Sequence, residues 1–159
     1  MEDRMKKKDN LGLHGKFELV ATHQDGEVFA TREILNIITT MGLTEVSKML
    51  IGAASDGFVW VAIGTGTTAA EIGDTTLETE ITTYGGARDE SESESTLAAV
   101  ATIPVTFTFL ESASFAITEV GLLNAETTGD LLARQVFAAI NVAEGDSLTA
   151  TWTITSAGV

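Results

Sequence analysis

The chain has 159 residues, 44% of them hydrophobic, which is enough apolar material for one compact domain. Its formal net charge is −14, and residues 49–159 account for −13 of it, because only Arg88 and Arg134 oppose fifteen acidic side chains there. Such a surface repels nucleic-acid phosphate. The apolar runs are shorter than the roughly 20 residues of a membrane helix. The absence of cysteine excludes disulfides and thiolate chemistry. We therefore expect no nucleic acid and no membrane among the partners.

The first segment of the chain is basic and lacks apolar periodicity. Its positive charges form one short cluster, made of Arg4, Lys6, Lys7 and Lys8. A charged run of this kind is typical of a solvated terminal arm. We divide the chain into an extended N-terminal arm, residues 1–14, and a single β-rich domain, residues 15–159.

A β-hairpin is predicted around Asp25 and Gly26. Apolar and polar residues alternate over residues 16–22 and again over residues 28–38. Asp-Gly between two alternating segments is among the strongest hairpin signals.

The next segment, GLTEVSKMLIG, has the apolar spacing of one short helix. Thr44 is the expected N-cap and Gly52 the expected stop signal. The residues expected to share one apolar face are Leu43, Val46, Met49 and Leu50.

The rest of the chain reads mainly as β-strands. A strand is predicted over residues 58–63, and Leu77 with Ile81 indicates either a helical turn or a lid over the core. Alternation then returns three times after residue 96, and Pro104 marks an edge or a bulge because it cannot donate to a ladder. In the last strand one apolar face is expected to hold Leu148, Ala150, Trp152 and Ile154.

A glycine-rich stretch, Gly64-Thr65-Gly66-Thr67-Thr68, raises the question of a phosphate site. It lacks the lysine of a mononucleotide loop and the third glycine of a dinucleotide fingerprint, and it stands in an antiparallel pattern. We therefore interpret Gly64 and Gly66 as turn residues with positive φ.

The remaining candidates for chemistry are also weak. His14 and His23 flank one predicted strand and have no partner nearby in sequence that would complete a metal set or a catalytic triad. An acidic, serine-rich segment, residues 84–96, predicts an exposed loop or edge, and whether its carboxylates between Asp89 and Glu94 bind a cation stays open. We predict no catalytic, cofactor-binding or metal-binding residues, no cofactor, and no enzymatic activity.

Three stretches carry a resemblance to a known family. They are a hairpin followed by GLTEVSKMLIG, then WVAIGTGTTAAEIGDTTLETEI, and then ITEVGLLNAETTGDLLARQVFAAINVAEGDSLTATWTIT. On these stretches, from about Gly15 to Thr155, the chain resembles small structural proteins of tailed-bacteriophage virions. Family members often have an arginine soon after the LETEI segment, and here Arg88 is followed by the acidic, serine-rich insert.

The resemblance implies a structural component located in the virion. With the sequence pattern it predicts an antiparallel β-sandwich or jelly-roll-like domain that decorates the capsid shell. The expected partners are other virion proteins, first the major capsid protein, and copies of the chain itself in a homo-oligomer, as a trimer. The alternative is a neck, baseplate or tail-fibre module, which includes a carbohydrate or receptor binder. Of the aromatic residues such a binder would use, Tyr84 is a candidate, whereas Trp60 and Trp152 are expected in the core.

Overall fold

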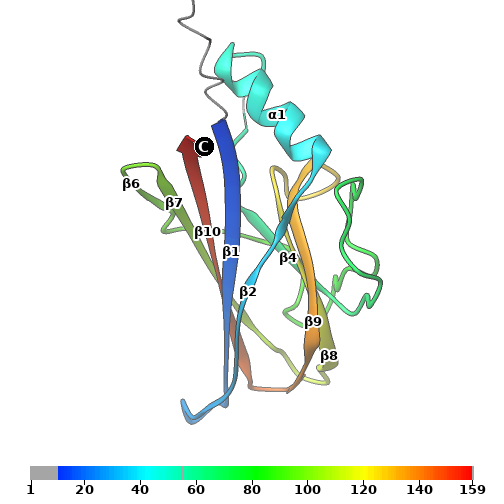
Figure 1. Ribbon diagram of the computed structural model, residues 1–159. Coiled ribbons are helices and arrows are strands. Elements are labelled where there is room, and N and C mark those ends of the chain that lie inside the picture. Colours follow the sequence, from blue (N-terminus) through cyan, green and yellow to red (C-terminus); the bar gives the residue numbers. More distant parts are fainter. Residues whose placement is uncertain (1–10, 55, 159) are drawn as a thin grey trace, which may run out of the picture.

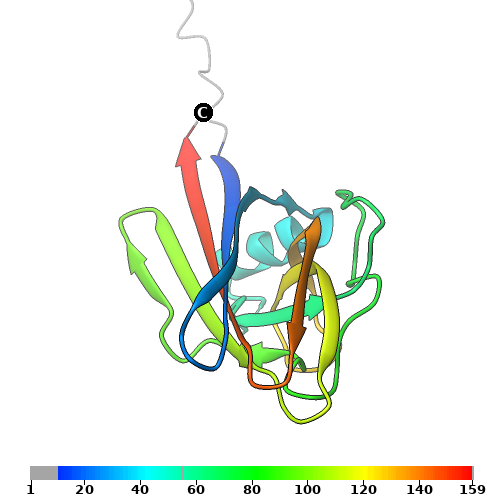
Figure 2. The same cartoon turned by 90° about the horizontal axis from the view of Figure 1, so that it is seen from below.

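A computed structural model describes residues 11–54 and 56–158 as two antiparallel β-sheets that face each other, with one helix at one end (Figures 1 and 2). The predicted antiparallel β-sandwich with one short helix is confirmed. Residues 1–10 of the expected arm lie outside the described residues, whereas residues 11–14 already belong to the first strand. No helix in the described ranges is long and apolar enough to cross a lipid bilayer.

The first sheet has the strand order β2, β1, β10, β7, β6. Its strands are β1 (Leu11–Thr22), β2 (Val28–Leu35), β6 (Ser95–Leu97), β7 (Val100–Thr108) and β10 (Ser147–Gly158). β1 and β10 pair over their whole lengths, so the two ends of the described chain lie side by side at one end of the sandwich (Figure 1). The predicted hairpin joins β1 to β2, and Gly26 in its turn has a φ of +88°.

The second sheet has the order β3, β9, β8, β4, β5. Its strands are β3 (Ile37–Ile38), β4 (Trp60–Gly64), β5 (Asp89–Glu90), β8 (Ser114–Leu123) and β9 (Leu131–Ala143). The strand predicted over residues 28–38 is therefore two strands in different sheets. The chain crosses between the sheets at Asn36, whose N–H donates to the carbonyl of Gly15 at 3.1 Å.

The core lies between the two sheets and is centred on aromatic side chains. Trp152 of β10 and Phe17 of β1 are both fully buried, with ring centroids 5.2 Å apart. Phe137 of the opposite sheet lies 5.8 Å from Phe17, so this contact joins the two layers. The face predicted for the last strand is confirmed as buried, with Leu148, Ala150, Trp152 and Ile154 all facing inward.

The helix α1 (Thr40–Leu50) covers one end of the sandwich (Figure 1). Its N-cap is Thr39 and not Thr44: the Thr39 hydroxyl accepts from the N–H of Gly42 at 2.9 Å and donates to the carbonyl of Leu131. Gly42 lies so close to β9 that an added Cβ would be 2.5 Å from the Cα of Leu132.

This close approach turns the buried face of α1 away from the predicted one. Leu43 and Leu50 are exposed by 46% and 76%, whereas Gly42 and Glu45 are buried. Val46 still packs on the core as predicted.

Two other local predictions are resolved by the sheets. β6 pairs with β7 only as far as Thr102, so Pro104 lies on an outer edge, as predicted. Leu77 and Ile81 are both buried within a non-helical segment that covers the core, which corresponds to the lid of the two alternatives.

We expect Trp152→Ala to lower the free energy of unfolding by about 3–5 kcal/mol, since it removes a fully buried aromatic side chain at the centre of the core. Trp152→Phe should cost less, because it keeps the ring contact with Phe17 and removes an indole N–H that has no hydrogen-bond partner in the structure. Urea unfolding followed by circular dichroism measures both values. An alanine variant that unfolds at the wild-type midpoint would contradict this placement of Trp152.

Candidate functional site

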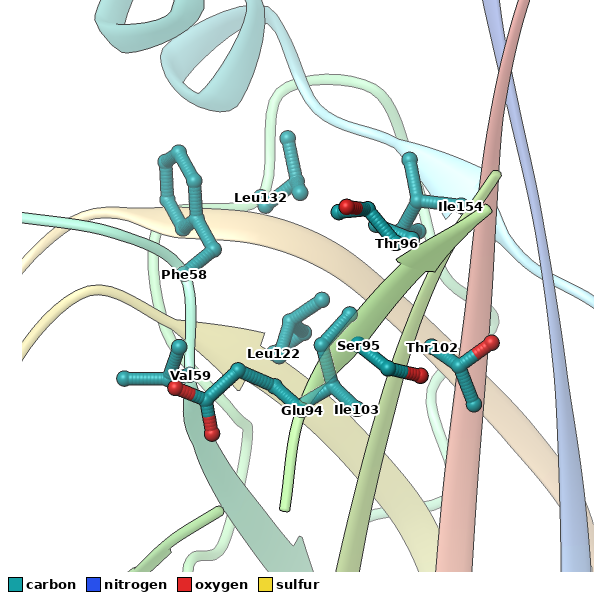
Figure 3. Close-up of a pocket in the computed structure, with 11 residues that line it drawn as sticks. Phe58, Val59, Glu94, Ser95, Thr96, Thr102, Ile103, Leu122, Leu132 and Ile154 are labelled. Atoms are coloured by element: carbon teal, nitrogen blue, oxygen red, sulfur yellow. The ribbon is translucent and has the colours of Figure 1, made fainter. Parts of the chain in front are cut away.

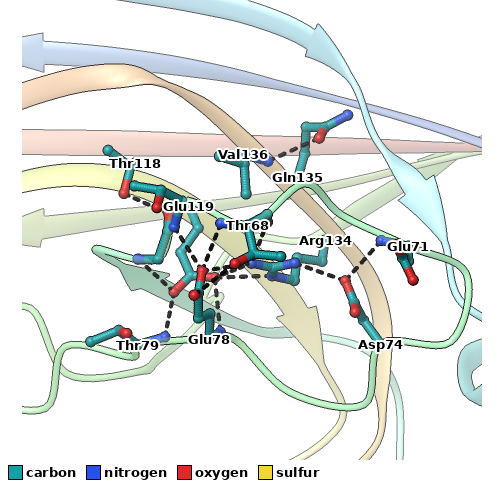
Figure 4. Close-up of polar contacts among 12 residues, drawn as sticks. Thr68, Glu71, Asp74, Glu78, Thr79, Thr118, Glu119, Arg134, Gln135 and Val136 are labelled. Atoms are coloured by element: carbon teal, nitrogen blue, oxygen red, sulfur yellow. Dashed lines mark hydrogen bonds and ion pairs between the residues drawn. The ribbon is translucent and has the colours of Figure 1, made fainter.

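The first candidate is built around the carboxylate of Glu119, on β8, which is completely buried. Its Oε1 accepts from the backbone N–H of Gly66 at 3.0 Å and of Thr79 at 2.7 Å. Its Oε2 accepts from the N–H of Glu78 at 3.0 Å and from Arg134 (Figure 4). Both ends of the loop formed by residues 64–79 are thus held by one side chain.

Arg134, on the neighbouring strand β9, supplies the countercharge and is 2% exposed. Its Nε lies 2.9 Å from Oε2 of Glu119, and its guanidinium also lies 2.8 Å from a carboxylate oxygen of Asp74. A third bond reaches the carbonyl of Thr68 at 3.1 Å. Figure 4 shows the guanidinium between Asp74 and Glu119, so it joins the middle of the loop to the sheet.

A second carboxylate, that of Glu78, binds the glycine-rich turn from the opposite side of the loop. One of its oxygens accepts from the N–H groups of Thr67 and Thr68, each at 2.7 Å, and the other accepts from the Thr68 hydroxyl at 2.8 Å. These bonds to the ionised form, first of all the backbone bond from Thr68, hold the pKa of Glu78 below its ordinary value.

Gly64 and Gly66 are required for close approach and not for positive φ, so the predicted turn geometry is wrong. Neither residue is among the glycines with positive φ. A Cβ on Gly66 would lie 2.5 Å from Oε1 of Glu119, and one on Gly64 would overlap the same oxygen. The two glycines therefore leave room for a buried carboxylate.

Glu119, Arg134, Asp74 and Glu78 together form an ionic centre, which binds the loop of residues 64–79. Each Glu119 oxygen already accepts two hydrogen bonds, so its lone pairs are used by groups of the same chain. A hollow of about 310 Å³ lies beside the centre, but the side chain of Arg134 that faces it is only 3% exposed. The arrangement anchors the loop of residues 64–79 to the sheet.

The second candidate is an apolar hollow of about 340 Å³ between the two sheets (Figure 3). One wall comes from Ile103 of β7 and Ile154 of β10, the other from Leu122 of β8 and Leu132 of β9. Phe58 and Glu94 also line the hollow, and no histidine or lysine does. It has the chemistry to accept an apolar group.

The predicted candidate residues do not come together. His14 lies exposed within β1, while His23, just after β1, bonds to Asp146 at 2.8 Å and stacks on Phe29 with ring centroids 4.2 Å apart. Asp89 and Glu90 form the exposed edge strand β5, which confirms an exposed loop or edge there. Within the described ranges, no group of three or more His, Asp or Glu side chains could hold a metal ion.

The three aromatic candidates differ in exposure. Trp152 is in the core as predicted, and Trp60 is half-buried against a small cluster that contains Leu77 and Leu123. Tyr84 is 49% exposed and lies beside Phe115. One exposed aromatic ring is a poor platform for a sugar.

Glu119, Glu78 and Asp74 were not predicted from the sequence as members of a site. One signal was present: Arg88 and Arg134 are the only two basic residues in a region with fifteen acids. Each proves to be an internal anchor, since Arg88 binds both carboxylate oxygens of Glu80 at 2.8 and 3.0 Å.

Comparison with known proteins finds no matching family model and no matching curated protein. The resemblance to virion proteins therefore remains an expectation from the sequence.

Removing one partner of the Glu119–Arg134 pair should be strongly destabilising. We expect Arg134→Met to lower the free energy of unfolding by about 3–5 kcal/mol, because it leaves the buried Glu119 carboxylate without its countercharge. Glu119→Gln should cost less, because Arg134 keeps its ion pair with Asp74. The double variant should lose less than the sum of the two, because the residues share one network. Urea unfolding measures all three, with the exposed Glu126→Gln as a control expected to change by less than about 0.5 kcal/mol. Strictly additive losses would show that the two side chains act independently.

The pair formed by His23 and Asp146 should make stability depend on pH. The hydrogen bond to Asp146 raises the pKa of His23 above its ordinary value of 6.5. Its stabilisation is therefore fully present below pH 6.5 and is lost as the pH rises through the higher folded-state value. We expect the difference in melting temperature between wild type and His23→Gln to shrink as the pH rises from about 6 to 8. A difference that stays constant or grows over this range would contradict the assignment.

Proposed function

We propose that the protein is a structural component of a tailed-phage virion, bound on the capsid shell as a decoration protein. The observation that supports this proposal is that the buried charged groups bind the protein's own chain. The ionic centre binds both ends and the middle of the loop of residues 64–79. Such a centre stiffens a domain that must keep its shape in an assembly. The sequence resemblance supplies the identity of the particle.

The outer surface also supports a role in assembly. Several large apolar side chains remain exposed at the end of the sandwich that carries α1, among them Leu43, Leu50 and Ile51. Exposed apolar residues that gather on one element are typical of contact surfaces between proteins. The major capsid protein and other copies of this chain are the partners we propose.

A neck, baseplate or tail-fibre module is the alternative. Its receptor-binding form would need an exposed site for a carbohydrate, and Tyr84 is the exposed member of the three aromatic candidates. We therefore place this function second.

Deleting residues 1–10 should leave folding intact and abolish attachment to particles. β1 begins at Leu11, so every described strand remains, while four of the nine basic residues are removed. Truncated and full-length protein would be mixed with particles that lack the protein, and bound copies counted after sedimentation. The matched control is full-length protein with Lys6, Lys7 and Lys8 changed to glutamine, which separates the loss of charge from the loss of chain.

Two outcomes would redirect the proposal. Equal occupancy by truncated and full-length protein would show that the folded domain makes the contact. Binding to isolated tails, with none to shells, would favour the neck or tail alternative.

A further inference from the structure

The outer edge of β7 is open beyond its short pairing with β6. β6 pairs with residues 100–102 only, and the hairpin of the two strands projects from the side of the sandwich (Figures 1 and 2). In an antiparallel strand the N–H and C=O of one residue point to the same side and alternate along the strand. The carbonyl of Pro104 accepts from Ser91, which is not part of the neighbouring strand β10, so the backbone groups of Thr106, two residues further along, face the same outer edge.

This edge is protected at Pro104 and open at Thr106. Pro104 has no N–H, and its carbonyl accepts from the Ser91 hydroxyl at 2.8 Å. Thr106 lies opposite Thr149 of β10 on the inner side, and no described residue bonds to its backbone from the outer side. The N–H and the C=O of Thr106 therefore remain exposed, and an added strand could pair with both of them.

A groove of about 330 Å³ lies along this open edge and is strongly acidic. Asp89, Glu90 and Glu92 line it together with Pro104 and Thr106. All three acidic residues are exposed, and within the described ranges none of them forms an ion pair. The groove thus combines free backbone groups with three uncompensated negative charges.

The cations of the described residues are already engaged elsewhere. Lys16, Lys48, Arg88 and Arg134 pair with Glu33, Glu45, Glu80 and Glu119, respectively. Arg32 donates to the carbonyls of Ala138 and Ala139 on β9. The remaining basic residues of the chain are the cluster within residues 4–8.

The backbone of that cluster is too short to reach Thr106 of its own copy. Leu11 pairs opposite Gly158, and Thr106 opposite Thr149, so the two positions lie nine residues apart along β10, about 30 Å at roughly 3.3 Å per residue. Fully extended from Leu11, Lys8 reaches about 10 Å and Arg4 about 25 Å. The groove of a second copy has no such limit.

We propose that the basic segment, residues 4–8, of one copy binds the β7 edge of a second copy, with its backbone paired to Thr106 and its lysines opposite Asp89, Glu90 and Glu92. The contact joins two different surfaces, so it closes into a ring when the rotation between copies allows it. This inference is independent of the virion assignment, because it concerns purified protein alone.

The test uses charge reversal in two complementary variants. Variant one carries Lys6→Glu, Lys7→Glu and Lys8→Glu, and variant two carries Asp89→Lys, Glu90→Lys and Glu92→Lys. Sedimentation velocity over a concentration series at low salt should show self-association of wild type and at least tenfold weaker association of each variant alone. An equimolar mixture should associate again, because each arm then meets a groove of opposite charge.

Two controls separate this contact from general charge effects and from misfolding. A matched variant, with Glu71, Glu111 and Glu126 changed to lysine, alters three exposed acids outside the groove and should associate at least as well as wild type. Melting curves of all variants verify that they are folded. Amide exchange should show Thr106 protected in wild type and exposed in variant one.

The proposal is overturned by any of three results: wild type that stays monomeric across the series, a mixture that associates no better than its components, or protection of Thr106 that does not depend on concentration. The last result would mean that a segment of the same copy covers the edge. Failure of particle attachment, in contrast, would leave this solution contact unaffected.

Discussion

Burial of the Glu119 carboxylate is the constraint on which the second sheet and its long loop depend. An ionised group without contact to water is tolerated only when hydrogen bonds and a countercharge replace its hydration. Three backbone N–H groups of the loop and the guanidinium of Arg134 fulfil this role. The loop must therefore return to β8 at both of its ends, and Leu77 between them is carried into the core as a consequence.

Because positive side chains are used inside the domain, the charge that remains on its outer surface is mainly negative. The region after residue 48 has two arginines, and both are nearly buried against carboxylates of the same chain. The exposed charges that remain in that region are negative, and three of them, those of Asp89, Glu90 and Glu92, line the groove along β7. Long-range repulsion between copies is the default for such a surface, so a specific contact needs a local cation at a defined place.

The sequence predicted what depends on local pattern. Alternation identified the buried face that contains Trp152, Asp-Gly identified the first hairpin, and Pro104 marked an edge because a missing N–H has the same consequence in any sheet. A helix in this segment was predicted, but its N-cap and its buried face were not, because the contacts of Thr39 with Leu131 and of Gly42 with Leu132 depend on β9. The ionic centre could not be predicted for the same reason: Glu119 is 53 residues from Gly66 and 15 from Arg134, and only the strand order brings them together.

The glycine-rich stretch shows why a pattern that suggests phosphate binding can arise without a phosphate. A phosphate loop exposes backbone N–H groups to an anion and uses glycine so that the anion can come close. Here the same physics applies to two anions from the chain itself, since Glu119 binds the N–H of Gly66 and Glu78 binds those of Thr67 and Thr68. No lysine is needed, because Arg134 already neutralises the buried carboxylate. The stretch is an anion-binding loop whose ligands are side chains, and that occupancy converts a potential ligand site into an anchor for the fold.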